Sequence, residues 1–427
     1  MTERISPVKS VGGSIRLPGD KSISHRYAML GAIAEGTTKI HNYSTGADCQ
    51  STLGCVQALG AGIERHNGEV WIQGRGSAGL TEPRATLDAG NSGSTIRMLS
   101  GILAAQPFAS RIAGDESLSR RPMERIIKPL AQMGAAIEAQ EGKFPPLSIS
   151  GRKLHPIDYT LPVASAQVKT CVLFGGLFAE GATVVHEPVR TRDHSEIALR
   201  GFGAEIEVSN RVITVTGPAR LKAQEVIAPG DLSSAAFFIV AALLLPGSSL
   251  VIESVGLNPT RSGLLDFLLG MGARIRILNL EDSAGELIGD VEVKYSPVRG
   301  GILEKAQTTA LIDEVPVLAV LGAASEEGLT VRDASELRIK ETDRIATVVE
   351  NLRRMGVEAE EMPDGLHVPG RQKFRAAEID SFGDHRIAMA FSVAALAAAG
   401  ECAIHDAGAA SVSFPEFYST LRSITAG

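Results

Sequence analysis

Cysteine and aromatic residues are both scarce in this chain. The 427 residues include four cysteines, and aromatic side chains make up 4% of the sequence. The cysteines have neither CxxC spacing nor paired histidines at ligand spacing, which argues against a disulfide framework and against a zinc site. We therefore expect reduced thiols in a cytoplasmic protein, and a core of alanine, leucine, isoleucine and valine. The cysteines are Cys49, Cys55, Cys171 and Cys402.

The chain also lacks an excess of positive charge and a long hydrophobic run. With 42 Lys and Arg against 49 Asp and Glu, its formal net charge is -7, so general binding to nucleic acid or to an anionic membrane is not expected. The longest apolar run, Ala235 to Leu245, ends at Pro246 and falls short of the roughly 18 residues that span a bilayer. It predicts a buried helix. The N-terminal sequence MTERISPVKSVGG has the features of neither a signal peptide nor a transit peptide.

Length and internal repetition predict two domains of mixed α/β class. A chain of 427 residues is too long to fold around one ordinary hydrophobic core, and two domains of about 200 residues are the natural division. A helix-to-strand signature recurs as ALGAGIE, QMGAAIE, GFGAEIE, GMGARIR and RMGVEAE. Its glycine is expected to supply the left-handed C-cap of an amphipathic outer helix. These glycines are Gly60, Gly134, Gly203, Gly272 and Gly356.

A second series of small, apolar segments interleaves with the first. Such helices, apolar on nearly all faces, are expected to be buried. The repeated unit is therefore predicted as strand, buried helix, strand, outer helix and strand, over about 70 residues. Six units would make two domains of three: residues 1–19 plus 229–427, and residues 20–228. The N-terminal segment 8–17 would supply the last strand of the sixth unit, and Pro-Gly pairs near 18–20 and 228–231 would form a hinge. An α/β repeat array without a cleft stays open as an alternative.

The starts of the predicted buried helices combine basic and small polar side chains. They read DKSISHR, GNSGSTIR, ASAQVK, GDLSS, IDEVP and GDHR. A helix N-terminus binds phosphate or carboxylate, whereas a cation at that end is unfavourable for helix stability alone. Repetition of this unfavourable placement predicts anion sites, although simple capping explains about half of the polar residues: Ser22, Asn91, Ser165, Asp231, Asp313 and Asp384.

Two of these starts allow a narrower interpretation. GDKS resembles a P-loop, but Asp20 separates Gly19 from Lys21, so ATP binding by this route is not expected. Asp313 and Glu314 precede Val-Pro and an apolar run, so at least one carboxylate is expected in a partly desolvated place suited to proton transfer.

Eight strings occur in order along nearly the whole chain: LPGDKSISHR, GNSGSTIR, RRPMERI, ASAQVK, IDEVPVLA, KETDRI, GDHRIAMAF and SFPEF. Together they resemble the 5-enolpyruvylshikimate-3-phosphate synthase family of enolpyruvyl transferases. The resemblance implies a two-domain inside-out barrel with the buried helices at its centre. It also implies transfer of the enolpyruvyl group of phosphoenolpyruvate to the 5-hydroxyl of shikimate 3-phosphate in the shikimate pathway, by a monomer without metal or organic cofactor.

The resemblance further implies roles for individual residues. Asp313 would handle the hydroxyl proton, and Glu341, with Lys21 as its rival, would protonate C3 of phosphoenolpyruvate. The residues implied for shikimate 3-phosphate are Lys21, Ser22, Arg26, Ser165, Ala166, Gln167, Asp313 and Lys340. Those implied for phosphoenolpyruvate are Lys21, Asn91, Gly93, Arg121, Gln167, Arg344 and Arg386. Lys169, Arg192 and His385 are additional candidates.

The chain departs from the family pattern at three places, and rival functions stay open. Val412 stands where many relatives have a lysine, Glu336 stands where some have an asparagine, and the segment around Arg192 differs. Gly93 leaves room where insensitive relatives have alanine, so we expect inhibition by glyphosate. The nearest rival, a UDP-N-acetylglucosamine enolpyruvyl transferase, typically uses a loop cysteine that GDESLSRRP lacks. A P-loop-like small-molecule kinase and a non-catalytic repeat scaffold are the alternatives from other classes.

Overall fold

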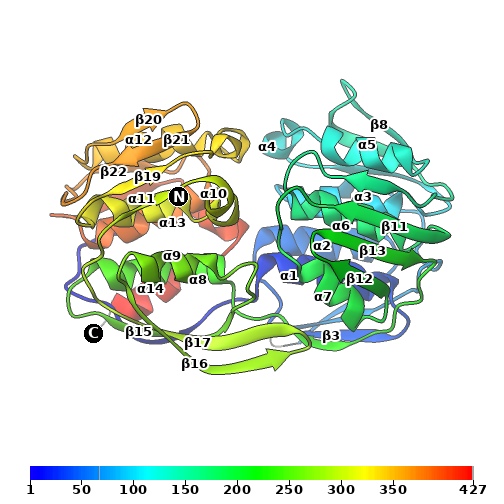
Figure 1. Ribbon diagram of the computed structural model, residues 1–427, viewed down its shortest axis with the longest axis horizontal. Helices are drawn as coiled ribbons and strands as arrows, with labels where there is room; N and C mark the ends of the chain where they lie inside the picture. The colour runs from blue at the N-terminus through cyan, green and yellow to red at the C-terminus, as the bar shows by residue number, and fades with distance from the viewer. Residues whose placement is uncertain (67, 426–427) are drawn as a thin grey trace. The chain divides into compact units, whose positions relative to one another are not determined.

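The computed structural model describes residues 1–66 and 68–425, and the chain divides into two compact units (Figure 1). Unit 1 comprises Met1–Pro18, Pro229–Asp282 and Leu287–Gly427, whereas unit 2 comprises Gly19–Ala228 and Ser283–Glu286. The chain thus passes from unit 1 to unit 2 after Pro18 and returns after Ala228. The four residues Ser283–Glu286 were expected in the same domain as their neighbours, but they belong to unit 2.

The repeat contains one more strand than the sequence predicted. In the second repeat of unit 2 the elements are β6 (Leu87–Asp88), α3 (Gly93–Leu103), β7 (Ala109–Ala113), α5 (Glu124–Gln132), β8 (Ala136–Gln140) and β9 (Phe144–Ser150), with the short α4 (Glu116–Ser119) before α5. The sheet order is β6-β7-β9-β8, with β6 parallel to β7 and β9 antiparallel to both neighbours. The predicted repeat ends at the strand that corresponds to β8, and β9 contains Pro145 and Pro146, which are unusual inside a strand.

The other repeats of unit 2 follow the same order. The first contains α1 (Lys21–Ile33), β3 (Thr37–His41), α2 (Ala47–Ala58), β4 (Gly62–His66) and β5 (Glu69–Gln73), and its first strand is β14 (Glu225–Ile227) from the end of the unit. The third contains β10 (Asp158–Thr160), α6 (Ala166–Gly176), β11 (Gly181–His186), α7 (His194–Gly201), β12 (Glu205–Ser209) and β13 (Val212–Gly217).

Unit 1 also contains three sheets within the described residues. Its first repeat contains β2 (Gly12–Arg16), α8 (Leu232–Leu244), β15 (Ser249–Gly256), α9 (Gly263–Gly270), β16 (Arg274–Ser283) and β17 (Glu286–Lys294). The second contains β18 (Gly301–Leu303), α10 (Lys305–Leu311), α11 (Val315–Ala324), β19 (Leu329–Val331), η1 (Ser335–Ile339), α12 (Arg344–Arg354), β20 (Glu360–Met362) and β21 (Gly365–Val368). The third contains β22 (Glu378–Asp380), α13 (His385–Leu396), β23 (Cys402–His405), η2 (Ala407–Val412), α14 (Phe417–Thr425) and β1 (Glu3–Ile5).

The predicted role of segment 8–17 in the sixth repeat was wrong. Its strand, β2, pairs in parallel with β15 and so opens the first repeat of unit 1. The strand that closes the last sheet is β1, which runs antiparallel to β23. Because β1 has three residues and buries only Ile5, it is too short to produce an alternating sequence pattern.

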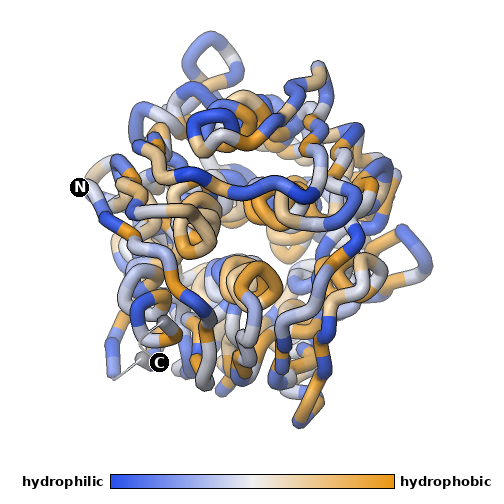
Figure 2. The backbone as a smooth tube through the Cα atoms, turned by 90° about the vertical axis from the view of Figure 1, so that its left-hand side faces the viewer, coloured by the Kyte–Doolittle hydropathy of each residue, from blue (hydrophilic) through white to orange (hydrophobic). Residues whose placement is uncertain are grey.

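The six apolar helices are buried, as predicted. They are α1, α3, α6, α8, α11 and α13. In unit 1, α8, α11 and α13 pack against one another, and Figure 2 shows hydrophobic colour on the central helices with hydrophilic colour on the surrounding loops. The five repeat glycines all have positive φ, from 75° to 96°, which confirms their role as left-handed helix C-caps.

Three of the expected N-caps are different residues. Asp20, not Ser22, caps α1 by accepting from the Ile23 amide. Ser92, not Asn91, caps α3, and α11 has no side-chain cap because Glu314 and not Asp313 stands at that position. Ser165, Asp231 and Asp384 cap their helices as expected.

Among the described residues, no single helix combines the length and apolar character needed to cross a membrane. Within residues 1–66 and 68–425, one bent pair, α10 and α11 at 109° to each other, is long and apolar enough when the two helices are taken together.

Candidate functional site

Arg26 is the centre of a polar cluster in unit 2, where α1, α6 and α7 meet. Its side chain projects from the second turn of the buried helix α1 and is 3% exposed. Its Nε donates to Ser195 Oγ at 2.7 Å, one Nη to Thr170 Oγ1 at 3.0 Å, and the other to the Ser22 carbonyl at 2.7 Å. Burial lowers the pKa of Arg26 to about 10, although the charge of Glu196 opposes that shift. The guanidinium is therefore a buried cation whose charge is incompletely compensated, a state that favours binding of an anion.

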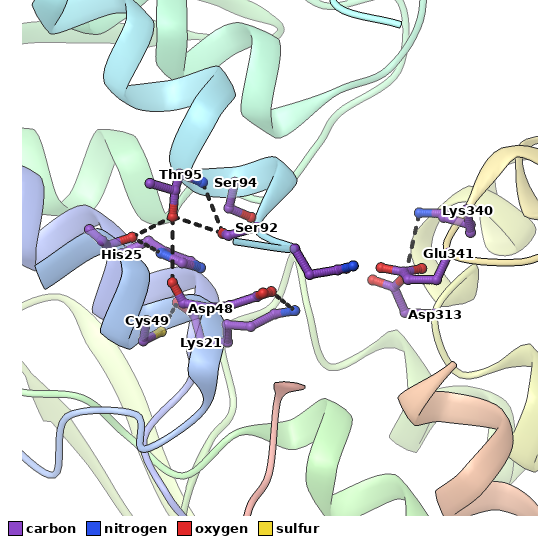
Figure 3. Close-up of polar contacts among 12 residues, drawn as sticks. Lys21, His25, Asp48, Cys49, Ser92, Ser94, Thr95, Asp313, Lys340 and Glu341 are labelled. Carbon is purple, nitrogen blue, oxygen red and sulfur yellow. Dashed lines mark hydrogen bonds and ion pairs between the residues drawn. The ribbon is translucent and has the colours of Figure 1, made fainter. Parts of the chain in front are cut away.

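Lys21 is held at the start of α1 by a carboxylate from α2 (Figure 3). Its Nζ donates to Asp48 Oδ2 at 2.9 Å, and the Lys21 side chain remains 20% exposed. The Thr95 hydroxyl lies 2.8 Å from Ser92 Oγ and 2.6 Å from Thr52 Oγ1. These buried contacts fix the starts of α1, α2 and α3 relative to one another.

The predicted ligands on α3 and α6 also lie together. Gln167 Oε1 accepts from Arg97 Nη1 at 2.8 Å, and its Nε2 donates to Ser94 Oγ at 2.9 Å. Ser165 caps α6 and Ala166 is its first residue, so backbone N–H groups at the start of α6 point toward the same region.

Asn91, Gly93 and Arg121 form a second group of predicted ligands in unit 2. Arg121 donates to Asn91 Oδ1 at 2.8 Å, and Asn91 Nδ2 donates to Asp115 Oδ2 at 2.8 Å. A Cβ atom added at Gly93 would lie 2.7 Å from Arg97 Nη1 and 3.8 Å from Arg121 Nη1. The glycine thus keeps open the space that two guanidinium groups face.

Lys169 is a poor candidate for direct substrate contact. Its side chain is 0% exposed, and its Nζ lies 2.6 Å from Glu196 Oε1 and 3.0 Å from Glu187 Oε1. The ammonium group is therefore enclosed between two buried carboxylates, and its role as a ligand stays a prediction. Arg192 lies in the loop before α7, half-buried, and its charge contributes to the lowered pKa of Arg26.

Arg344 is the centre of a second cluster, in unit 1, at the start of α12. Its side chain is 2% exposed, and it donates to both oxygens of Asp384, at 2.7 and 3.2 Å, and to Glu341 Oε2 at 2.6 Å. Burial lowers the pKa of Arg344, but the charges of Asp384 and Glu341 outweigh it and raise the pKa above its usual value. The pairing fixes the guanidinium plane beside the start of α13.

Asp313 lies beside this cluster, together with Lys340 (Figure 3). Its Oδ1 is 3.5 Å from Lys340 Nζ and 3.6 Å from Arg344 Nη1, and its side chain is 19% exposed. The Asp313 carbonyl accepts from Arg386 Nη1 at 2.8 Å. A partly exposed carboxylate beside two cationic side chains, with a third bound to its backbone carbonyl, can accept a proton from a hydroxyl group while those cations hold an anion.

Glu314 is the buried member of the predicted carboxylate pair. It is 1% exposed, accepts from Ser233 Oγ, and lies 3.1 Å from Arg261 Nη2 and 3.8 Å from Arg386 Nη1. Of the two carboxylates, the neighbour Asp313 is therefore the one accessible for proton transfer. His385, the first residue of α13, is 2% exposed.

Several residues of these clusters were not found from the sequence. They are Asp48, Thr170, Glu187, Ser195 and Glu196 in unit 2 and Arg261 in unit 1. No motif connects them, since each is a single polar residue brought to the cluster by tertiary packing. One signal was available: Ser195 and Glu196 lie in the DHSE string directly after Arg192. Across the part of the chain that the structure describes, no group of three or more His, Cys, Asp or Glu residues could hold a metal ion.

The family model, the related sequences and the solved structures that this chain resembles all belong to one family. The family model of EPSP synthase (3-phosphoshikimate 1-carboxyvinyltransferase) matches residues 5–421. A 3-phosphoshikimate 1-carboxyvinyltransferase of Solibacter usitatus is 69% identical over 424 residues, covering 99% of this chain and 100% of the relative. The corresponding protein of Koribacter versatilis is 53% identical over 99% of this chain and 98% of its own.

A solved structure of EPSP synthase from Acinetobacter baumannii has the same fold. It is 42% identical in sequence, superposes with a TM-score of 0.89, and covers 99% of this chain and 98% of its own. Because the family model and these relatives match almost end to end, the chain belongs to the EPSP synthase (3-phosphoshikimate 1-carboxyvinyltransferase) family.

Proposed function

We infer that the chain transfers the enolpyruvyl group of phosphoenolpyruvate to the 5-hydroxyl of shikimate 3-phosphate and releases phosphate. It is an enolpyruvyl transferase of the shikimate pathway, and the UDP-N-acetylglucosamine enolpyruvyl transferase and the kinase are not favoured. The observation that carries the assignment of residues is the buried, incompletely compensated guanidinium of Arg26 beside the starts of α1 and α6. A dianionic phosphate supplies the negative charge that compensates this guanidinium.

The clusters in unit 2 supply most of the residues that bind the two phosphorylated substrates. Lys21, Ser22 and Arg26 bind shikimate 3-phosphate with Ser165, Ala166 and Gln167, whose helix start adds backbone donors. The group of Asn91, Gly93 and Arg121 takes phosphoenolpyruvate, because planar guanidinium groups bind carboxylate and phosphate bidentately.

The unit 1 cluster performs the proton transfers. Asp313 takes the proton of the 5-hydroxyl as its oxygen attacks C2 of phosphoenolpyruvate, and Lys340 binds near that hydroxyl. Glu341 or Lys21 gives a proton to C3, which produces a tetrahedral intermediate. Loss of phosphate from C2 and of a proton from C3 then restores the double bond. Arg344 and Arg386 stabilise the negative charge of the carboxylate and the leaving phosphate.

Finer features of the family are proposed along with the activity. The two units are its two three-repeat domains, arranged as an inside-out barrel. A monomer in the cytoplasm, without metal or organic cofactor, and inhibition by glyphosate stay predictions from the sequence.

The activity is tested by mixing the purified chain with shikimate 3-phosphate and phosphoenolpyruvate, without metal or nucleotide. We expect release of one inorganic phosphate for each enolpyruvyl product formed. Omitting either substrate should abolish that release. Phosphate release from phosphoenolpyruvate alone, or none from the complete mixture, contradicts the proposed function.

Gly93→Ala is expected to raise the KM for phosphoenolpyruvate by roughly ten-fold and to lower sensitivity to glyphosate. The new methyl group would lie 2.7 Å from Arg97 Nη1, so the flexible arginine must move and lose its hydrogen bond to Gln167. A hydrogen bond with one charged partner is worth about 1.5 kcal/mol. Steady-state kinetics check the result, with thermal unfolding expected near that of the parent.

Gly54→Ala is the matched control for this substitution. Gly54 lies in α2 of the same unit, and a Cβ atom there meets no other atom within 4 Å. Its kinetics should equal those of the parent. A KM that stays unchanged in Gly93→Ala would contradict the assignment of phosphoenolpyruvate to this group.

A further inference from the structure

Two hydroxyl groups from different helices meet the Arg26 side chain inside unit 2. Ser195, in the first turn of α7, and Thr170, in α6, are both 0% exposed. Each accepts a hydrogen bond from a different nitrogen of the guanidinium, at 2.7 and 3.0 Å, and the two hydroxyls also bond to each other. Two of the three guanidinium nitrogens are thus held by side chains that are not among the predicted ligands.

The direction of every hydrogen bond in this group follows from the donors available. Thr170 Oγ1 donates its one proton to the Ala166 carbonyl at 2.7 Å, so in the contact between the hydroxyls Ser195 must be the donor. Both oxygens then present only lone pairs to Arg26. Because neither hydroxyl can rotate without losing a bond, the pair is a fixed acceptor for one orientation of the guanidinium.

The first turn of α7 is anchored on both sides of Ser195. His194 Nδ1 lies 2.7 Å from Glu286 Oε1, and Glu196 Oε1 lies 2.6 Å from Lys169 Nζ, with all four side chains at most 4% exposed. Burial raises the pKa of Glu196, although the charge of Lys169 opposes this. Since Lys169 and Thr170 are adjacent in α6, the ion pair joins the two helices at the level where their hydroxyls meet Arg26.

We propose that Ser195 and Thr170 are positioning residues for shikimate 3-phosphate recognition, holding the Arg26 guanidinium in the orientation that binds the phosphate, and that the Lys169–Glu196 pair keeps Ser195 in place. The inference rests on the proposed function, in which Arg26 binds that phosphate. It predicts that the hydroxyls affect the affinity for this substrate and not the affinity for phosphoenolpyruvate.

Ser195→Ala should raise the KM for shikimate 3-phosphate by roughly ten-fold, because one hydrogen bond to a charged group is lost and the guanidinium is free to reorient. The KM for phosphoenolpyruvate should stay within about two-fold, since its predicted ligands make no contact with Ser195. Equal rises in both KM values would indicate a general disturbance of the fold and overturn the proposal.

Thr170→Val and Thr170→Ser separate the hydroxyl from the shape of the side chain. The valine variant keeps the volume and loses the acceptor, so its KM for shikimate 3-phosphate should rise by roughly ten-fold. The serine variant keeps the acceptor and should restore that KM to within about three-fold of the parent. Thr183→Val is the matched control, because Thr183 in β11 is also 0% exposed and its Oγ1 makes no hydrogen bond in the described residues. A valine effect that serine does not rescue overturns the proposal.

In Glu196→Ala, the direction of the change in KM for shikimate 3-phosphate distinguishes positioning of Arg26 from simple electrostatic attraction of the phosphate. Removing a negative charge near Arg26 should lower the KM for shikimate 3-phosphate if charge alone mattered. Loss of the anchor should raise it instead, and an unchanged or lower KM contradicts the anchoring role.

Arg26→Lys, measured in parallel, separates failure of this inference from failure of the proposed function. If it raises the KM for shikimate 3-phosphate while Ser195→Ala and Thr170→Val do not, only the positioning role is wrong. If Arg26→Lys has no effect on that KM, the proposed phosphate site is wrong, and the positioning role with it.

Discussion

Asp313→Asn is expected to lower kcat by roughly 100- to 10,000-fold, the usual contribution of a general base, with both KM values changed by less than about five-fold. Asparagine has nearly the same shape and still accepts from Lys340, whose Nζ is 3.5 Å from Asp313 Oδ1. The bond from Arg386 reaches the backbone carbonyl at 2.8 Å, so the substitution leaves it in place. What is lost is the ability to take the proton of the 5-hydroxyl. Steady-state and single-turnover kinetics measure the effect.

The division of the effect between kcat and KM decides the role of Asp313. A variant that binds both substrates less tightly but turns over at the parental rate would make Asp313 a binding residue and not a base. Asp266→Asn is the matched control, because Asp266 is exposed on α9 of the same unit. Its kinetics should match those of the parent.

The repeat architecture was predictable because each repeat carries its own local signals. Glycine at the end of each outer helix has positive φ in all five copies, a conformation that other residues adopt at a cost. The fourth strand of the repeat was not predicted, and in one repeat, that of β9, its sequence signals conflict with its structure. Proline removes a backbone donor, and Pro145 and Pro146 nevertheless lie in β9, where tertiary packing overrides local preference.

The sequence predicted the cationic residues at the helix starts of the candidate site. It did not predict the side chains that bind those cations. Lys21, Arg26 and Arg386 stand out because cations at buried helix starts are unfavourable unless they have a function, whereas Arg344 was named through the family resemblance. Asp48, Thr170 and Ser195 are ordinary residues in their local sequence. They contact those cations only because separate repeats pack their helices together, and such long-range contacts leave no periodic pattern in a single sequence.

Lys169→Met is expected to destabilise unit 2 by about 3–5 kcal/mol at pH 7, the cost of leaving buried charges without their partner. Lys169 is 0% exposed and is the cation for Glu187 and Glu196, whose side chains are 3% and 4% exposed. Methionine fills a similar volume but leaves two carboxylates close together in a desolvated place. The shift in the midpoint of urea unfolding measures the loss. Lys153→Met is the matched control, because Lys153 and Glu180 form a pair with both side chains 69% exposed, and such a pair contributes less than about 1 kcal/mol.

The pH dependence of the Lys169→Met effect tests its cause. Burial raises the pKa of Glu196 above its ordinary value even beside Lys169, and removal of the lysine raises that pKa further. A carboxyl whose folded-state pKa is raised contributes stability that is full below its unfolded pKa and is lost as pH rises through the folded pKa. The deficit of the variant should therefore be largest at pH 7 and smaller at pH 5, and adding Glu196→Gln should recover part of it at pH 7. A deficit that is the same at both pH values and unaffected by Glu196→Gln would mean that lost packing, and not an unpaired charge, destabilises the variant.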